Sequence, residues 1–213
     1  MTQKSFSILG DSISSFVGYI PAENEYFYPE PAFGVTAVED MWWAILAERL
    51  NLQLFCNDSY SGARISRTGL KPPTSCYLDT SRQRNLGGDY IIVFGGTNDW
   101  GNKDEPATLE VFTSAYQELV EMMVDLHPES AIYFCTPLQR LDRKLTTPNV
   151  HGWTQLDLAE AIRTAVAQVP GAHLIDLASY SINEADNLLP DGVHPNRGGM
   201  QMLAKLMEAG LTG

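Results

Sequence analysis

The sequence of 213 residues has little cysteine and no cysteine motif that would hold a metal. Its three cysteines, Cys56, Cys76 and Cys135, are widely spaced, odd in number and form neither a CxxC pair nor a Cys/His cluster. Their number and spacing argue against a disulfide framework and a structural zinc site. The N-terminus also lacks the basic, then apolar, then small-residue order of a secretory leader, so we expect a cytoplasmic protein.

Positive charge and long apolar runs are scarce as well. The chain has 14 Lys and Arg against 26 Asp and Glu, a formal net charge of −12. So acidic a surface repels phosphate backbones and anionic lipids, which argues against nucleic-acid and membrane-surface partners. No apolar run approaches the roughly 18 residues of a membrane span. With 44% hydrophobic residues the composition is that of a globular protein, and we expect residues 1–213 to form one domain.

Short, nearly continuous apolar segments alternate with longer amphipathic ones. The pattern predicts strands at 5–9, 52–56, 89–94, 131–135 and 172–177, and helices at 40–50, 108–126, 154–169 and 197–209. Apolar strands of this kind suit a parallel sheet that is covered on both faces. The alternation therefore predicts an α/β fold, a three-layer α/β/α sandwich with right-handed crossovers.

Chemically capable residues follow the predicted strands or precede the last predicted helix. Ser12, Gly62 and Asn98 come after the first, second and third strands, and Asp191 lies three residues before His194. In an open α/β sheet, ligands bind beyond the carboxyl ends of the strands. We therefore expect these five residues to meet at one site.

This set of residues matches the needs of acyl transfer. A serine hydroxyl needs a base, and an imidazole can serve near neutral pH. A carboxylate on the second ring nitrogen fixes the tautomer, and one tight turn can bring Asp191 to His194. The backbone N–H groups of Ser12 and Gly62 and the amide of Asn98 would stabilise the oxyanion. The residue types thus predict a serine hydrolase.

Four segments carry a family resemblance. They are Gly10-Asp11-Ser12, the Asn-Asp-Ser-Tyr-Ser-Gly run that ends at Gly62, Gly96-Thr97-Asn98-Asp99, and Asp191-Gly192-Val193-His194-Pro195. In content and order they resemble the four sequence blocks of the SGNH (GDSL-type) hydrolases. The first block has Ile13 where the family name has leucine, which exchanges one branched aliphatic side chain for another.

The resemblance implies a flavodoxin-like fold with a five-stranded parallel sheet and hydrolysis of esters or thioesters without a metal or other cofactor. By position, Ser12 would be the nucleophile that forms an acyl-enzyme, His194 the general base and Asp191 its orienter. Ser12, Gly62 and Asn98 would form the oxyanion hole. The expected partner is a small-molecule ester.

Two long segments, 13–39 and 60–88, are rich in aromatic or hydroxyl side chains, and loops of this length usually serve function. They favour a short-chain (acetyl) carbohydrate esterase. A lipid or thioester acylhydrolase is the alternative. A non-catalytic flavodoxin-like binding module is a remote one, because it would be expected to have lost a block.

Three residues are candidate substrate contacts. Trp100 directly follows the third block and would wall the cleft. Arg64 would contact a substrate carboxylate or hydroxyl, or else pair with a surface acid. Tyr19 would stack on a sugar, line an acyl groove or simply pack its loop against the domain. We expect Asp11 and Asp99 to anchor loops.

Overall fold

The computed structural model of the chain describes residues 3–101, 107–186 and 188–213. Five parallel strands form one sheet in the order β2-β1-β3-β4-β5. This flavodoxin-like order confirms the predicted α/β/α sandwich. The strands are β1 (Ser5–Gly10), β2 (Gln53–Ser59), β3 (Tyr90–Phe94), β4 (Ala131–Cys135) and β5 (Ala172–Ile175).

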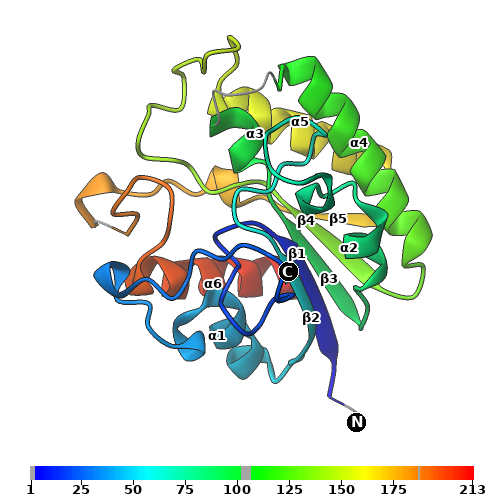
Figure 1. The fold of residues 1–213 in the computed structure, drawn as a ribbon, viewed down its shortest axis with the longest axis vertical. Helices are drawn as coiled ribbons and strands as arrows, with labels where there is room; N and C mark the ends of the chain where they lie inside the picture. The colour runs from blue at the N-terminus through cyan, green and yellow to red at the C-terminus, as the bar shows by residue number, and fades with distance from the viewer. Residues whose placement is uncertain (1–2, 102–106, 187) are drawn as a thin grey trace.

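Helices cover both faces of the sheet (Figure 1). Helices α1 and α6 lie on one face, and α4 and α5 lie on the other. Each face has its own core of buried apolar side chains, centred on Trp42 and Met200 on the first face and on Phe112 and Ile162 on the second. The helices are α1 (Trp42–Leu50), α2 (Thr80–Arg84), α3 (Thr97–Gly101), α4 (Leu109–Leu126), α5 (Gln155–Gln168) and α6 (Arg197–Thr212). Short 3-10 turns occur at Pro31–Phe33, Val38–Asp40, Pro73–Ser75, Leu177–Ser179 and Glu184–Asp186.

Side-chain caps set where the long helices begin. The Thr108 side chain accepts from the N–H of Val111, and Thr154 forms a capping box with Asp157. The Asn196 side chain caps α6 by accepting from the N–H of Gly199. The last cap matters for the site, because it fixes the end of the loop that carries His194.

The second strand is longer than predicted and continues into polar residues beyond position 56. Asn57, Asp58 and Ser59 are all buried within β2. Their polar groups are satisfied inside the protein: Asn57 donates to the carbonyl of Ser14 at 3.0 Å, and the Ser59 hydroxyl donates to Asn57 at 2.6 Å. Apolar patterning cannot predict a strand whose inner half is held by hydrogen bonds.

The other differences from prediction are local. The first helix starts at Trp42 because a 3-10 turn occupies Val38–Asp40, and the fifth strand ends at Ile175 before another 3-10 turn. Helices α2 and α3 were not predicted, since each has only five residues. Asn98 therefore lies in the first turn of α3 and not in a loop, as its place after a strand suggested.

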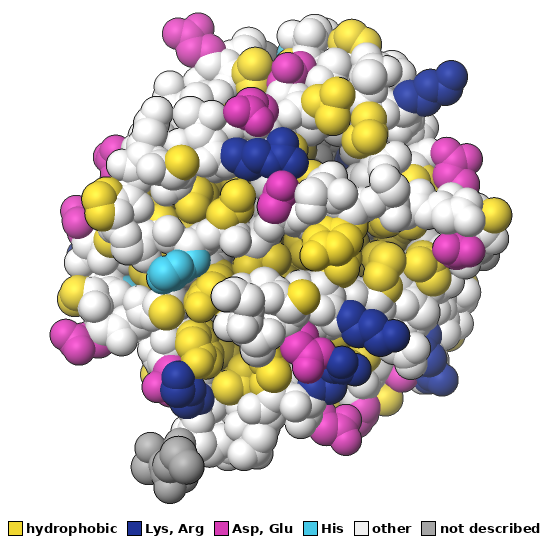
Figure 2. Space-filling model, turned by 180° about the vertical axis from the view of Figure 1, so that it is seen from behind, with side chains coloured by type: hydrophobic (Ala, Val, Ile, Leu, Met, Phe, Trp, Pro, Cys, Tyr) yellow, Lys and Arg dark blue, Asp and Glu magenta, His cyan; other side chains and the backbone are white. Residues whose placement is uncertain are grey.

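Charges of both signs are interspersed on the face in Figure 2, with apolar side chains between them. The acidic side chains on that face are scattered and do not form one continuous patch. Within the three described ranges, no helix has both the length and the apolar character to cross a bilayer.

Candidate active site

A hydrogen-bonded relay joins the end of β1 to the loop before α6. The Ser12 Oγ lies 2.8 Å from His194 Nε2, and His194 Nδ1 lies 2.7 Å from an Asp191 carboxylate oxygen. Ser12 is almost fully buried, whereas the His194 side chain keeps 17% of its surface exposed. The structure therefore brings together the three residues that the sequence predicted to act as nucleophile, base and orienter.

The Asp191 carboxylate is also held by its own loop. Its other oxygen accepts from the backbone N–H of Val193 at 2.8 Å and of His194 at 2.7 Å. Burial by itself would raise the pKa of Asp191, but these hydrogen bonds and the one from His194 lower it to about 2. The carboxylate is thus ionised wherever the imidazole can act as a base.

Gly192 makes the turn between the carboxylate and the imidazole feasible. Its φ of 80° is in the left-handed region, and a Cβ there would lie 2.5 Å from the backbone nitrogen of Asp142. The N–H of Leu141 donates to the Gly192 carbonyl at 2.8 Å. The segment around Leu141 thereby braces this turn, which requires glycine.

Asp11 shapes the turn that presents Ser12. Its buried carboxylate accepts from the N–H of Ile13 at 3.0 Å, which agrees with the predicted anchoring role. Burial raises the pKa of Asp11 to about 6, although the hydrogen bond from Ile13 and the positive potential of His194 and Arg82 oppose the shift. Ionisation of Asp11, the residue directly before Ser12 in the chain, is therefore energetically unfavourable.

Three candidate oxyanion donors come from three segments. Within the described residues, neither the N–H of Ser12 nor that of Gly62 donates to another protein group. Asn98 donates one amide hydrogen to the carbonyl of Ala63 at 2.9 Å, and the amide has a second hydrogen to offer. Gly62 has a φ of 81°, a conformation that suits glycine.

Asp99 anchors the segment that carries these donors, as predicted. Its buried carboxylate accepts from the N–H groups of Ile65 and Ser66, both at 2.9 Å, and from the Ser66 hydroxyl at 2.6 Å. Burial raises the pKa of Asp99 against these hydrogen bonds. The carboxylate ties α3 to the loop that follows Gly62, and so fixes Asn98 relative to that glycine.

A buried ion pair, which the sequence analysis missed, supports the same region. The Arg82 Nε lies 2.9 Å from an Asp58 carboxylate oxygen, and neither residue exposes more than 3% of its surface. The same guanidinium donates to the carbonyl of Gly10 at 3.0 Å and to that of Ser75. Arg82 therefore joins the ends of β1 and β2 to the segment around Ser75. Nothing in the sequence of segment 60–88 indicated that Arg82 would form a buried ion pair.

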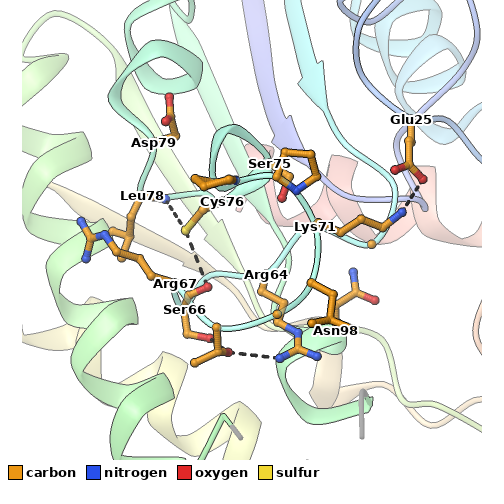
Figure 3. A pocket seen from close by; sticks show the side chains of 16 residues that line it. Glu25, Arg64, Ser66, Arg67, Lys71, Ser75, Cys76, Leu78, Asp79 and Asn98 are labelled. Carbon is orange, nitrogen blue, oxygen red and sulfur yellow. Dashed lines mark hydrogen bonds and ion pairs between the residues drawn. The ribbon is translucent and has the colours of Figure 1, made fainter. Parts of the chain in front are cut away.

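A pocket of about 800 Å³ opens beside Gly62 and Asn98. Figure 3 shows Arg64 and Asn98 close together at one end of it, and the ion pair of Glu25 with Lys71 at its edge. The polar part of the lining includes Arg64, Ser66, Arg67, Thr68, Lys71 and Asn98. Leu70, Leu78, Cys76 and two prolines form the apolar part.

Two of the three predicted substrate contacts, Arg64 and Trp100, are buried. Arg64 lines the pocket, is buried and donates to the Thr68 hydroxyl at 3.1 Å, and its role in substrate binding stays a prediction. Trp100 is fully buried, and its indole N–H donates to the carbonyl of Trp153 at 3.0 Å. The prediction that Trp100 walls the cleft is therefore wrong: an indole that follows a strand-end block can turn inward and join the core.

Tyr19 lies apart from the pocket lining. It is 46% exposed and packs against Phe16 and Trp43, with ring centroids 6.1 and 5.6 Å away. Trp42 and Trp43 are buried in the core. A role for Tyr19 in substrate binding stays a prediction.

An aromatic residue that the sequence analysis left unassigned lies on the candidate base. The Phe27 ring is parallel to the His194 imidazole, with centroids 3.7 Å apart and an interplanar angle of 6°. The crowding of aromatic residues in segment 13–39 was the available signal, but it did not indicate which ring would reach the base.

In the described ranges, no group of three or more His, Cys, Asp or Glu residues is placed to hold a metal ion.

Comparison with known proteins agrees with this geometry. A profile of the family described as GDSL-like lipase/acylhydrolase matches residues 4–210. A structure described as a GDSL-like lipase from Bacteroides ovatus superposes with a TM-score of 0.72 and 28% identity, covering 98% of both chains.

Two more distant relatives act on carbohydrates. An acetylxylan esterase from Xylanibacter ruminicola is 24% identical over 143 residues, which are 58% of this chain but only 28% of that protein. A family two carbohydrate esterase from Clostridium thermocellum, in complex with cellohexaose, has a TM-score of 0.65 at 18% identity over 97% of this chain and 62% of its own. The second likeness shows the shared fold. Because the family profile spans almost the whole sequence, the chain belongs to the GDSL-like lipase/acylhydrolase family and is a carboxylic ester hydrolase.

Proposed function

We propose that the chain is a serine esterase that removes short acyl groups, acetyl above all, from carbohydrate esters. The observation that carries the proposal is the relay Asp191–His194–Ser12 at 2.7 and 2.8 Å, together with a pocket that two of the candidate oxyanion residues, Gly62 and Asn98, line. Such a relay supplies the nucleophile and the base, and the pocket supplies room for the substrate.

The first half-reaction makes an acyl-enzyme. His194 Nε2 takes the proton of the Ser12 hydroxyl as Oγ attacks the ester carbonyl carbon. The carbonyl electron pair moves to its oxygen, which accepts hydrogen bonds from the N–H groups of Ser12 and Gly62 and from the Asn98 amide. When the tetrahedral intermediate collapses, the carbon–oxygen bond to the alcohol breaks. The leaving oxygen then takes the proton from His194.

The second half-reaction restores the enzyme. His194 takes a proton from a water molecule, whose oxygen attacks the acyl carbon on Ser12. Collapse of this second intermediate releases the carboxylic acid and returns the proton to the Ser12 oxygen. Asp191 stays ionised throughout and stabilises the imidazolium in both steps.

The pocket has the size and the polar groups to take a polar alcohol. An acetyl group places only one methyl on the acyl side, so most of a pocket of about 800 Å³ is left for the rest of the substrate. Thr68 and Lys71 line the pocket and carry hydroxyl and ammonium groups of the kind that bind sugar hydroxyls. The carbohydrate esterases among the relatives support the same class.

The test is a chain-length series of nitrophenyl esters, from acetyl to decanoyl, followed by acetylated xylan and acetylated cello-oligosaccharides. We expect the acetyl ester to be cleaved best, release of acetate from an acetylated glycan, and loss of both activities in Ser12→Ala. A preference for octanoyl or decanoyl esters would replace this proposal with a lipid or thioester acylhydrolase. Unchanged hydrolysis by Ser12→Ala would overturn the serine mechanism itself.

A further inference from the structure

Phe27 and Tyr28 contact both the loop that carries His194 and the turn that carries Ser12. Phe27 stacks face to face on His194, with ring centroids 3.7 Å apart. Tyr28, the next residue, is fully buried, and its hydroxyl donates to the carbonyl of Pro195 at 2.6 Å. Two consecutive residues thus contact the candidate base and the residue that follows it.

The same dipeptide is bonded to the turn that carries the nucleophile. The N–H of Phe27 donates to the Ser15 hydroxyl at 2.9 Å, and that hydroxyl donates to the carbonyl of Ser12 at 3.0 Å. The carbonyl of Tyr28 accepts from the N–H of Val17 at 3.0 Å. A short chain of hydrogen bonds therefore links the backbone under the Phe27 ring to Ser12.

We propose that Phe27 and Tyr28 form a clamp that positions His194 against Ser12, and that the Phe27 ring stabilises the imidazolium formed during the reaction. The inference rests on the proposed function, because it assigns a task to residues around the proposed base. The clamp is needed because Ser12 and His194 come from opposite ends of the chain. Phe27 and Tyr28 add direct contacts between the two segments to the hydrogen bond between the Ser12 and His194 side chains.

The electrostatics of the stack favour the charged ring. The face of a phenyl ring carries the negative part of its quadrupole, so it attracts a cation that lies over it. Among the described residues, Asp191 on its own loop and Asp11 directly after β1 interact electrostatically with His194. Both can carry negative charge, and with the Phe27 face they all favour the imidazolium.

Substitutions at Phe27 test both tasks proposed for its ring, the positioning of His194 and the stabilisation of the imidazolium. With nitrophenyl acetate, we expect Phe27→Leu to lower kcat about tenfold with little change in KM, because the base is less well oriented and its charged form less stable. The acid limb of kcat/KM should move about 0.5 pH unit lower, which corresponds to about threefold in the protonation equilibrium. Phe27→Tyr keeps an aromatic face and should retain the wild-type kcat and pH profile.

Tyr28→Phe tests the other arm of the clamp. It removes only the hydroxyl that binds the Pro195 carbonyl, so we expect kcat to fall about threefold without a shift of the acid limb. Tyr26→Leu is the matched control, since Tyr26 lies in the same segment but is 54% exposed. It should behave as wild type, and the thermal melting of every variant shows whether it is folded.

The results can overturn the clamp without touching the proposed function. A folded Phe27→Leu enzyme with wild-type kcat and an unmoved acid limb would contradict it, and so would a loss confined to KM. A folded Tyr28→Phe enzyme with unchanged kcat would remove the second arm. If Ser12→Ala remained fully active, the proposed function would fail instead, so the two failures are distinguishable.

Discussion

The Nε2 atom of His194 lies 2.8 Å from the Oγ atom of Ser12, although 182 positions separate the two residues in the chain. The parallel sheet makes this contact possible, because β1 ends at Gly10, directly before the turn that holds Ser12. The cap at Asn196 begins α6 directly after the loop that holds His194. The contact between these two atoms is the basis of the proposed serine mechanism.

Asn98→Ala should slow acyl transfer without unfolding the protein. Loss of one oxyanion donor typically lowers kcat about 10²- to 10³-fold. Asn98 is only partly buried and makes one hydrogen bond, to Ala63, so the melting temperature should change little. Steady-state kinetics on nitrophenyl acetate check the first expectation and thermal unfolding the second. A kcat within threefold of wild type would exclude Asn98 from the oxyanion hole.

Asp191→Asn should cost activity at every pH. The amide cannot hold the His194 tautomer that a carboxylate holds, and such a change typically lowers kcat by about 10⁴. Because hydrogen bonds from His194 and Val193 outweigh burial and bring the pKa of Asp191 to about 2, no protonation of this group slows the wild type above about pH 4. Kinetics from pH 4 to 9 test this, and a defect that vanishes at high pH would contradict it.

The lowered pKa of Asp191 also predicts a pH effect on stability. A carboxyl whose pKa is lower in the folded state stabilises the fold above its ordinary pKa of 3.8, and this contribution is lost as the pH falls through about 2. The difference in unfolding free energy between wild type and Asp191→Asn should therefore shrink as the pH falls from 5 towards 2. Urea unfolding at several pH values measures it. A difference that grows on acidification would be the wrong sign.

Asp11→Asn should show the opposite dependence. Burial raises the pKa of Asp11 from 3.8 to about 6, so its ionisation opposes folding. That cost is absent below about pH 4, grows as the pH rises to about 6 and is then constant, reaching roughly 3 kcal/mol. The asparagine can still accept from Ile13 and carries no such cost. Relative to wild type, the variant should gain stability between pH 4 and 7, and parallel stability curves would contradict this.

Substitutions at Arg82 and Asp58 should have strongly non-additive effects on the unfolding free energy. Because both side chains are buried, Arg82→Met leaves an uncompensated charge and should cost about 3–5 kcal/mol of unfolding free energy. Asp58→Asn should be costly for the same reason. Added to Arg82→Met, it should cost much less than it does alone, since no charge then remains unpaired. Additive effects in this double-mutant cycle would show that the two residues act independently.

Much of the fold and of the candidate site was predictable from the sequence. Apolar strands that alternate with amphipathic helices specify a parallel sheet, and the ends of its strands share one edge. The positions of Ser12, Asn98 and His194 therefore followed from the order of the segments. Their meeting required no knowledge of the loops between them.

What could not be predicted depends on hydrogen bonds and loop paths. The buried half of β2 is polar, so its hydropathy is that of a loop until the partners of Asn57 are known. Trp100 turns into the core, and Phe27 reaches His194 from a long segment with several aromatic residues. Sequence spacing does not specify where such a segment runs, because its conformation is set by tertiary contacts.

The most direct test of the serine mechanism is to locate the covalent adduct. Wild-type enzyme and Ser12→Ala would be treated with a fluorophosphonate, digested and analysed by peptide mass spectrometry. We expect one adduct, on Ser12, formed in parallel with loss of esterase activity, and none in the variant. An inactivated enzyme whose Ser12 peptide is unmodified, or an adduct on another residue, would contradict it.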